Sequence, residues 1–180
     1  SVNKDSITVT GEDDEIIIYY IRKESTVTVH HYEYGTTNKL AEDEVIEGKV
    51  NDEYETHPAN VPSKYEVYEI PVNAEGTITE EPIEVIYYYI KKETKVIVHH
   101  YEEGTTNKLS ENVEIVGRVD DEYTTSPATD IPLKYELAQE PANKVGIMTE
   151  QEIHVIYYYR VKETKAIVRY LEKDTNIELA

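Results

Sequence analysis

The sequence lacks cysteine, tryptophan and phenylalanine, and it contains a single methionine. Without cysteine, neither disulfide bonds nor thiolate metal ligands can hold the fold together, so stability must come from apolar burial and hydrogen bonds between strands. The 17 tyrosines therefore supply all of the aromatic side chains. This composition is unusual for a cytosolic enzyme.

Basic residues are scarce. Lysine and arginine total 18 against 37 aspartates and glutamates, which gives a formal net charge of -19. A surface of this sign repels nucleic acid and anionic membranes, so we expect neither as a partner. No apolar run approaches the roughly 18 residues that cross a bilayer, and the first residues lack the order of a signal peptide. We therefore expect no membrane insertion in this segment, and any targeting segment to lie outside it.

The strongest feature of the sequence is an internal repeat. YIRKESTVTVHHYEYGTTNKL at residues 20–40 recurs as YIKKETKVIVHHYEEGTTNKL at residues 89–109. A further copy begins with KETKAIVRYLEKDTNIEL and stops, so we expect the chain to be a piece of a longer protein. The predicted division is a tail of a preceding copy (1–22), repeat one (23–91), repeat two (92–161) and the start of a third copy (162–180).

Each repeat reads as a small, mostly β domain. Short segments rich in Val, Ile, Thr and Tyr alternate with Gly and Pro, and no helical period persists over 11 or more residues. The predicted strands are 26–33, 44–49, 65–70 and 83–90, with counterparts one repeat later, and at most a short helical turn near 51–60. A repeat of about 70 residues is large enough to form its own small hydrophobic core. The junction IEVIYYYIKKETKVIVHH has no Gly, Pro or Ser, so we expect a stiff link and an elongated rod of domains.

Comparison of the copies predicts which strand face is buried. Val27 and Val29 stay apolar in every copy, whereas the alternate set contains Thr28 and His30 and is more polar. Alternate residues of a strand point to opposite faces, so the first set should face the core. Its counterparts are Val96 and Val98 in repeat two, and Ala166 and Val168 in the third copy.

A set of spaced residues resembles a known family. The pattern is VxVxxxxxG near the start of the repeat, Gly then Tyr in the middle, Tyr-x-Leu after a Pro, Asn-x-x-Gly, and a closing VxYxY. In repeat two it consists of Val96, Val98, Gly104, Gly117, Tyr123, Tyr135, Leu137, Asn143, Gly146, Val155, Tyr157 and Tyr159. It resembles the MucBP repeats, mucin-binding-protein-like modules of cell-wall-anchored proteins in Gram-positive bacteria. The resemblance implies a β-grasp or ubiquitin-like arrangement, secretion, and display on the cell surface.

The sequence contains no recognisable catalytic constellation, so an enzyme is not expected. There is no cysteine, GxSxG or HExxH, and the recurring histidines have no recurring Ser or Asp at an informative spacing. The doublets His30-His31 and His99-His100 cannot readily bind one ion, because adjacent strand residues point to opposite faces. We predict one inward and one outward histidine in each doublet.

Two sets of residues are candidates for binding. The tyrosine runs at residues 87–89 and 157–159 must place rings on both strand faces, so the outward rings either pack across strands or stack on a sugar. The glycan-contact candidates are Tyr88, Tyr158, Tyr32 and Tyr101, and Tyr34 is a further sugar-facing residue. Acidic clusters are weaker candidates for calcium, because none matches a spaced DxDxDG loop. These candidates are Asp52, Glu53, Asp120, Asp121 and Glu122, and no other cofactor is expected.

Two functions remain open from sequence. The first is the repeat region of a cell-surface adhesin, a stalk attached to the cell wall that also contacts mucin or host glycans and packs beside neighbouring repeats of the same chain. The alternative is a dedicated carbohydrate-binding module with one tyrosine-lined site in each repeat. Sialylated or sulfated mucin would be repelled by this acidic chain unless calcium bridged the two.

Overall fold

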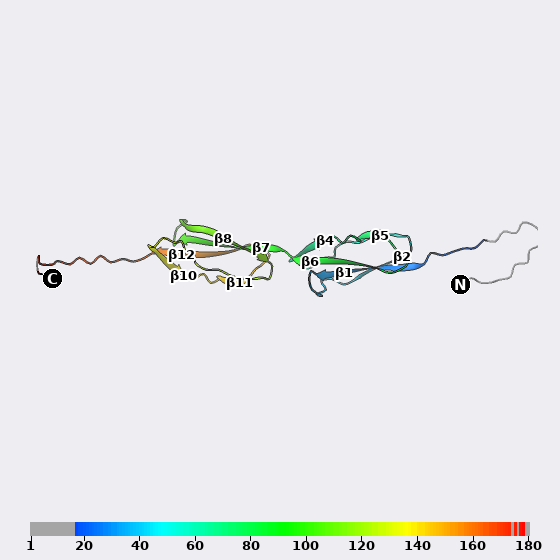
Figure 1. Cartoon of the computed structure of the whole chain (residues 1–180), viewed down its shortest axis with the longest axis horizontal. Coiled ribbons are helices and arrows are strands. Elements are labelled where there is room, and N and C mark those ends of the chain that lie inside the picture. Colours follow the sequence, from blue (N-terminus) through cyan, green and yellow to red (C-terminus); the bar gives the residue numbers. More distant parts are fainter. Residues whose placement is uncertain (1–16, 174, 176, 179–180) are drawn as a thin grey trace, which may run out of the picture. The chain divides into compact units, whose positions relative to one another are not determined.

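The computed structural model describes residues 17–173, 175, 177 and 178, and it divides the chain into two compact units (Figure 1). The first unit consists of residues up to 61 together with 67–89, and the second of residues 62–66 together with those from 90 onward. The described residues contain twelve strands and no helix. None of them therefore forms a helix long and apolar enough to cross a membrane. The fold is all-β, with small domains in tandem, as the sequence predicts.

The strands are arranged in the same way in both repeats. In repeat one they are β1 (Glu24–Glu33), β2 (Glu44–Lys49), β3 (Glu53–Glu55), β4 (Tyr65–Glu69), β5 (Glu75–Thr77) and β6 (Ile83–Lys91). In repeat two they are β7 (Glu93–Glu102), β8 (Lys108–Arg118), β9 (Glu122–Thr124), β10 (Tyr135–Gln139), β11 (Val145–Ile147) and β12 (Ile153–Val161). Each repeat thus combines a four-stranded sheet, β2-β1-β6-β4 or β10-β12-β7-β8, with a two-stranded one, β3-β5 or β9-β11.

The first and last strands of each repeat lie side by side at the centre of the larger sheet. β1 runs parallel to β6, with Val29 opposite Val85, and antiparallel to β2. β7 and β12 pair in parallel in the same register, with Val98 opposite Val155. The β-grasp arrangement implied by the family resemblance remains a prediction, as do the predicted domain boundaries.

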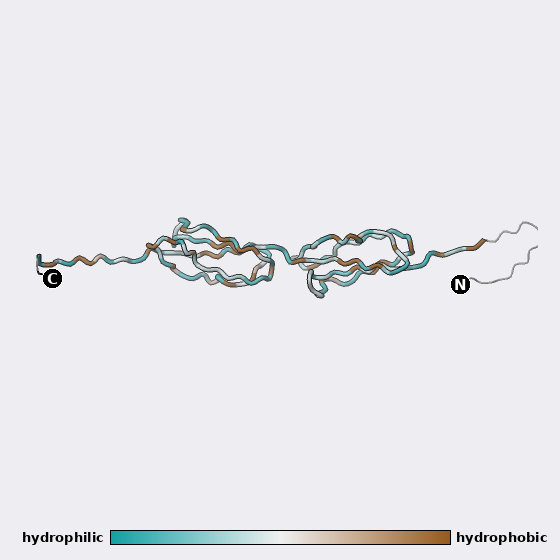
Figure 2. Tube along the Cα trace, viewed as in Figure 1, coloured by the Kyte–Doolittle hydropathy of each residue, from teal (hydrophilic) through white to brown (hydrophobic). Residues whose placement is uncertain are grey.

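The predicted inward face is confirmed in both units. Val27 and Val29 are completely buried, as is Val96, while Val98 is 2% exposed. Figure 2 shows apolar residues along the central strands of each unit. The closing strands add three further buried residues to each core, Val85, Tyr87 and Tyr89 in the first and Val155, Tyr157 and Tyr159 in the second. Strand alternation therefore determines the core.

The buried aromatic rings of these cores are tyrosines, and each brings a hydroxyl that needs a hydrogen-bond partner when it is buried. The Tyr87 hydroxyl donates to the carbonyl oxygen of Thr56 at 2.9 Å. The Tyr89 hydroxyl accepts from the backbone N–H of Ala59 at 2.8 Å and lies 2.9 Å from Nδ1 of His31. In the second unit, Tyr159 contacts Ala128 and His100 in the same way, at 3.1 Å each.

His31 and His100 are the inward members of the two doublets, as predicted, with exposed fractions of 2% and 0%. Each ring stacks on a core tyrosine, Tyr87 or Tyr157, at a centroid distance of 5.6 Å. Burial lowers the pKa of both histidines, because the charged imidazolium loses its hydration.

Two expectations from sequence are wrong. The segment near 51–60 forms strand β3 rather than a helical turn, because Glu53 to Glu55 pair with β5. The set Ala166 and Val168 is not inward, since Val168 is 71% exposed and its region forms no sheet. The equivalent valines of β7, Val96 and Val98, lie in a sheet in which β12 pairs beside β7. Of the predicted tail at 1–22, residues 1–16 lie outside the described residues, and Ile17 to Ile21 are exposed.

Candidate functional site

The outward face of each central strand pair carries the tyrosines predicted to contact glycans. The parallel register places Tyr32 directly opposite Tyr88 in the first unit, and Tyr101 directly opposite Tyr158 in the second. The four candidates therefore form two cross-strand pairs, one in each unit. Tyr158 is 40% exposed, while the other three are partly covered by neighbours.

Two further tyrosines extend the pair in the first unit. Tyr34 and Tyr68 stack with ring centroids 4.1 Å apart and an interplanar angle of 28°. Tyr34 also meets Tyr88 edge-on, at 5.9 Å and 89°. We call Tyr34, Tyr68 and Tyr88 the tyrosine platform. The exposed fractions of 48% for Tyr34 and 45% for Tyr68 leave ring surface available to a ligand.

Local structure holds the platform in place. Tyr34 follows β1 directly, and its backbone N–H donates to the carbonyl oxygen of Tyr89 at 2.7 Å. The next residue, Gly35, turns the chain with a φ of 73°, a conformation that glycine adopts without steric cost. Tyr68 lies on β4, next to β6 in the sheet. Its pKa is raised, chiefly by a hydrogen bond with Tyr34.

The second unit has no equivalent platform. The positions that correspond to Tyr34 and Tyr68 are Glu103 and Ala138, so only Tyr158 remains of the three. On this face Tyr101 stacks on His99, with centroids 5.9 Å apart and an interplanar angle of 12°, as Tyr32 stacks on His30 in the first unit at 6.0 Å and 23°. The sequence already suggested Tyr34 as a sugar-facing residue, whereas Tyr68 was missed, although the difference between the copies at these two positions is visible in the alignment of the repeats.

The predicted calcium candidates lie in the turns that follow β2 and β8. Asp52 accepts the backbone N–H of Lys49 at 2.9 Å and pairs with Arg22 at 2.5 Å. These contacts lower the pKa of Asp52, the backbone hydrogen bond having the larger effect. Asp121 caps its turn in the same way, accepting the backbone N–H of Arg118 at 2.7 Å.

The remaining acidic candidates do not converge either. Asp120 pairs with Lys64 and Lys91, at 2.7 and 3.2 Å. Glu53 and Glu122 are exposed at the first positions of β3 and β9. Across the part of the chain that the structure describes, no three His, Cys, Asp or Glu side chains form a group that could hold a metal ion. Calcium binding therefore stays a prediction.

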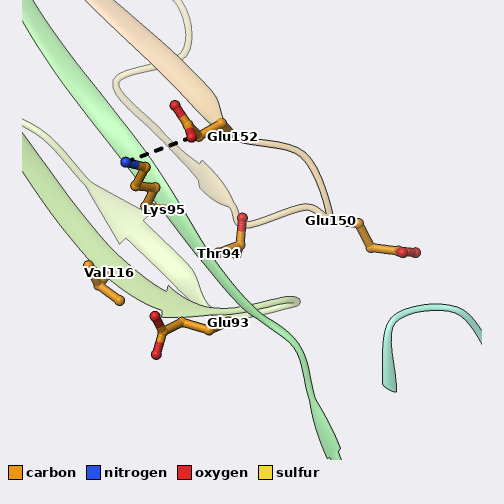
Figure 3. Close-up of a pocket in the computed structure, with 6 residues that line it drawn as sticks. All are labelled: Glu93, Thr94, Lys95, Val116, Glu150 and Glu152. Carbon is orange, nitrogen blue, oxygen red and sulfur yellow. Dashed lines mark ion pairs between the residues drawn. The ribbon is translucent and has the colours of Figure 1, made fainter. Parts of the chain in front are cut away.

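A depression of about 300 Å³ on the second unit is a poor candidate for a sugar site (Figure 3). It is lined by Glu93, Thr94, Lys95, Val116, Glu150 and Glu152. The lining contains three carboxylates and one lysine, whose ammonium group already lies 3.8 Å from Glu152 and 3.1 Å from Glu114. With no aromatic ring and a negative lining, this surface offers little to a neutral or anionic sugar.

Comparisons with known proteins agree with this architecture. A family model described as "MucBP domain" matches residues 26–90 and 95–160. Internalin J of Listeria monocytogenes serovar 1/2a is 32% identical over 158 residues, which are 84% of this chain and 18% of that protein. Internalin I of serotype 4b is 27% identical over 82% of this chain and 8% of its own length. The chain thus spans less than a fifth of these relatives.

Solved structures with similar chains are also repeats. Domains 3–4 of the Streptococcal High Identity Repeats in Tandem (SHIRT) from a cell surface protein match with a TM-score of 0.39 and 11% identity, covering 76% of this chain and 98% of theirs. The type 2 repeat of the mucus binding protein MUB from Lactobacillus reuteri matches with a TM-score of 0.28 and 13% identity, covering 77% of this chain and 100% of its own.

Proposed function

Because the chain belongs to the MucBP domain family, we propose that it is part of the repeat region of a bacterial cell-surface adhesin. In this proposal the parent protein is extracellular and attached to the cell wall, and the repeats act as a stalk rather than as an enzyme. We further propose that the first unit contacts mucin-type or other host glycans. The tyrosine platform is the observation that carries this second part.

The platform has the properties of a weak sugar-binding surface. Exposed ring faces can pack against the C–H face of a pyranose, and the phenolic hydroxyls can exchange hydrogen bonds with sugar hydroxyls. The edge-on contact between Tyr34 and Tyr88 limits the rotation of both rings, which reduces the entropy lost on binding. The net charge of -19 disfavours sialylated and sulfated chains, so neutral glycans should bind best.

The difference between the two units bears on the alternative function. A dedicated carbohydrate-binding module with one site in each repeat would need a similar surface in both. The second unit has Glu103 and Ala138 where the platform has Tyr34 and Tyr68. The platform therefore favours a stalk with one glycan contact in this segment.

Glycan binding should depend on the platform and not on the equivalent face of the second unit. We expect a neutral mucin-type glycan at millimolar concentration to shift the NMR signals of Tyr34, Tyr68 and Tyr88. Tyr34→Ala and Tyr68→Ala should each weaken binding by about fivefold, because a stacking partner of a ring is worth roughly 1 kcal/mol. Tyr158→Ala is the matched control and should bind like the parent chain. Binding lost in Tyr158→Ala alone, or no binding at all, would leave the repeats as a spacer only.

Calcium remains proposed as a bridge to anionic mucin. If carboxylates such as Asp52 and Asp121 shared an ion with sialylated or sulfated chains, mucin binding should weaken when the ion is removed. The measurement is retention of the chain on sialylated mucin in calcium and in excess chelator. Equal retention in both conditions would contradict the bridge.

A further inference from the structure

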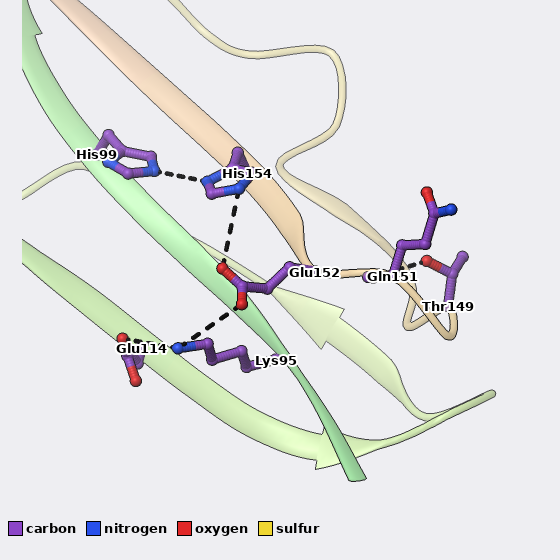
Figure 4. A network of polar contacts seen from close by, with 7 residues as sticks. All are labelled: Lys95, His99, Glu114, Thr149, Gln151, Glu152 and His154. Carbon is purple, nitrogen blue, oxygen red and sulfur yellow. Dashed lines mark hydrogen bonds and ion pairs between the residues drawn. The ribbon is translucent and has the colours of Figure 1, made fainter. Parts of the chain in front are cut away.

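Two histidines from strands far apart in sequence meet on the outward face of the second unit. His99 lies on β7 and His154 on β12, and the parallel register places them diagonally, with His154 opposite Ile97 and His99 opposite Ile156. Nε2 of His99 lies 2.9 Å from Nδ1 of His154, and the ring centroids are 5.1 Å apart (Figure 4). The two imidazole nitrogens thus face each other at hydrogen-bond distance.

The surroundings leave this pair open to an ion. The His154 side chain is 51% exposed, so one side of the pair faces solvent. A carboxylate oxygen of Glu152 lies 3.9 Å from the other ring nitrogen of His154, Nε2. Lys95 holds Glu152 from the opposite side, at 3.8 Å, and also contacts Glu114 (Figure 4). The other ring nitrogen of His99, Nδ1, is buried without a hydrogen-bond partner.

The first unit shows that this pairing is specific to the second. His30 occupies the position of His99, but its Nδ1 lies 2.8 Å from a carboxylate oxygen of Asp43. Asp43 corresponds to Asn112 in the second repeat, and His154 corresponds to Glu84 in the first. From the first repeat to the second, Asp43 is replaced by Asn112 and Glu84 by His154. These two differences convert a histidine–carboxylate pair into a pair of histidines.

We propose that His99 and His154 together bind one divalent transition-metal ion, zinc or copper(II). A metal–nitrogen bond of about 2.0 to 2.1 Å with tetrahedral angles places two nitrogens about 3.3 Å apart. The observed 2.9 Å is close to this value, so a small opening of the pair admits the ion once the proton between the two nitrogens has moved, through solvent, to the other nitrogen of its own ring, which leaves both imidazoles neutral. A carboxylate oxygen of Glu152 lies 3.9 Å from Nε2 of His154, so it would have to move closer to accept the remaining N–H, as carboxylates do beside metal-ligating histidines.

Ligand chemistry determines which ions fit. Imidazole nitrogens suit zinc and copper(II), whereas calcium and magnesium prefer sets of six or more oxygens. No third histidine or carboxylate joins the pair within the described residues, so water or a ligand from another molecule completes the coordination. The site therefore differs in chemistry and in place from the acidic turns considered for calcium.

The test is a calorimetric titration of the tag-free chain with zinc chloride. The buffer contains excess magnesium, which occupies the surface carboxylates. We expect one zinc ion per chain, and changes in the imidazole NMR signals of His99 and His154. His154→Gln and His99→Gln should each weaken zinc binding by at least tenfold.

His30→Gln is the matched control, because it removes the equivalent histidine of the first unit. It should leave the affinity and the stoichiometry unchanged. Circular dichroism establishes that each variant keeps its strands. The proposal fails if zinc does not bind, or if folded His154→Gln and His99→Gln bind it as tightly as the parent chain does.

Discussion

Replacing Tyr87 with alanine is expected to destabilise the first unit by about 3–5 kcal/mol, the cost of truncating a large buried aromatic residue. The ring is completely buried and stacks on His31, and its hydroxyl donates to the carbonyl oxygen of Thr56. The truncation leaves both a cavity and an unpaired carbonyl group. A domain of this size has a total stability of roughly 4–10 kcal/mol, so most of it should be lost.

The second unit should remain folded in this variant. Its buried cluster, which contains Val96, Val98, Tyr157 and Tyr159, draws no residue from the first unit. Native-state hydrogen exchange should therefore show fast exchange for amides of β1 and β6 and unchanged protection for β7 and β12. Tyr157→Ala is the mirror experiment, and Tyr87→Phe should cost only about 1–2 kcal/mol because the ring is kept. Loss of protection in both units would contradict the predicted division into separate domains.

Acid is expected to destabilise both units through their buried histidines. Burial lowers the pKa of His31 and His100 in the folded chain, while the unfolded chain keeps values near 6.5. Between 6.5 and the lower folded value, the unfolded chain binds more protons than the folded chain. Stability should therefore be constant above about pH 7 and fall as pH decreases from 6.5, by at most about 1.4 kcal/mol per pH unit for each histidine.

The slope of the free energy of unfolding against pH separates the contribution of the buried histidines from that of other titrating groups. Urea unfolding between pH 5.5 and 7.5 stays above the range where most carboxylates titrate. In His31→Gln the first unit should be less stable at every pH, but its stability should vary less with pH. His57→Gln removes a histidine whose side chain is 72% exposed and should leave the slope unchanged. A slope that persists fully in His31→Gln would show that other groups cause the loss.

Most of the fold could be predicted from sequence, because its signals are local. Alternation at Val27 and Val29, repeated at Val96 and Val98, identifies the strands and their inward face without knowledge of strand pairing. The family pattern was likewise readable from spaced glycines and tyrosines, and the family match over both repeats confirms it. Strands of three residues were missed, because so short a segment has no measurable period. β3 forms only because β5 supplies its backbone partners.

The sequence by itself determined the tandem β repeats, the buried tyrosines and the inward histidines, since a strand's period of two residues is encoded in consecutive positions. Tertiary structure alone decided which outward side chains meet. Tyr34 and Tyr68 come together because β4 joins β6 at the sheet edge. His99 and His154 come together because the parallel register brings the last strand of the repeat beside the first. Val168 is apolar and correctly spaced but exposed, because its region joins no sheet: alternation marks a strand face, and only pairing and packing bury it.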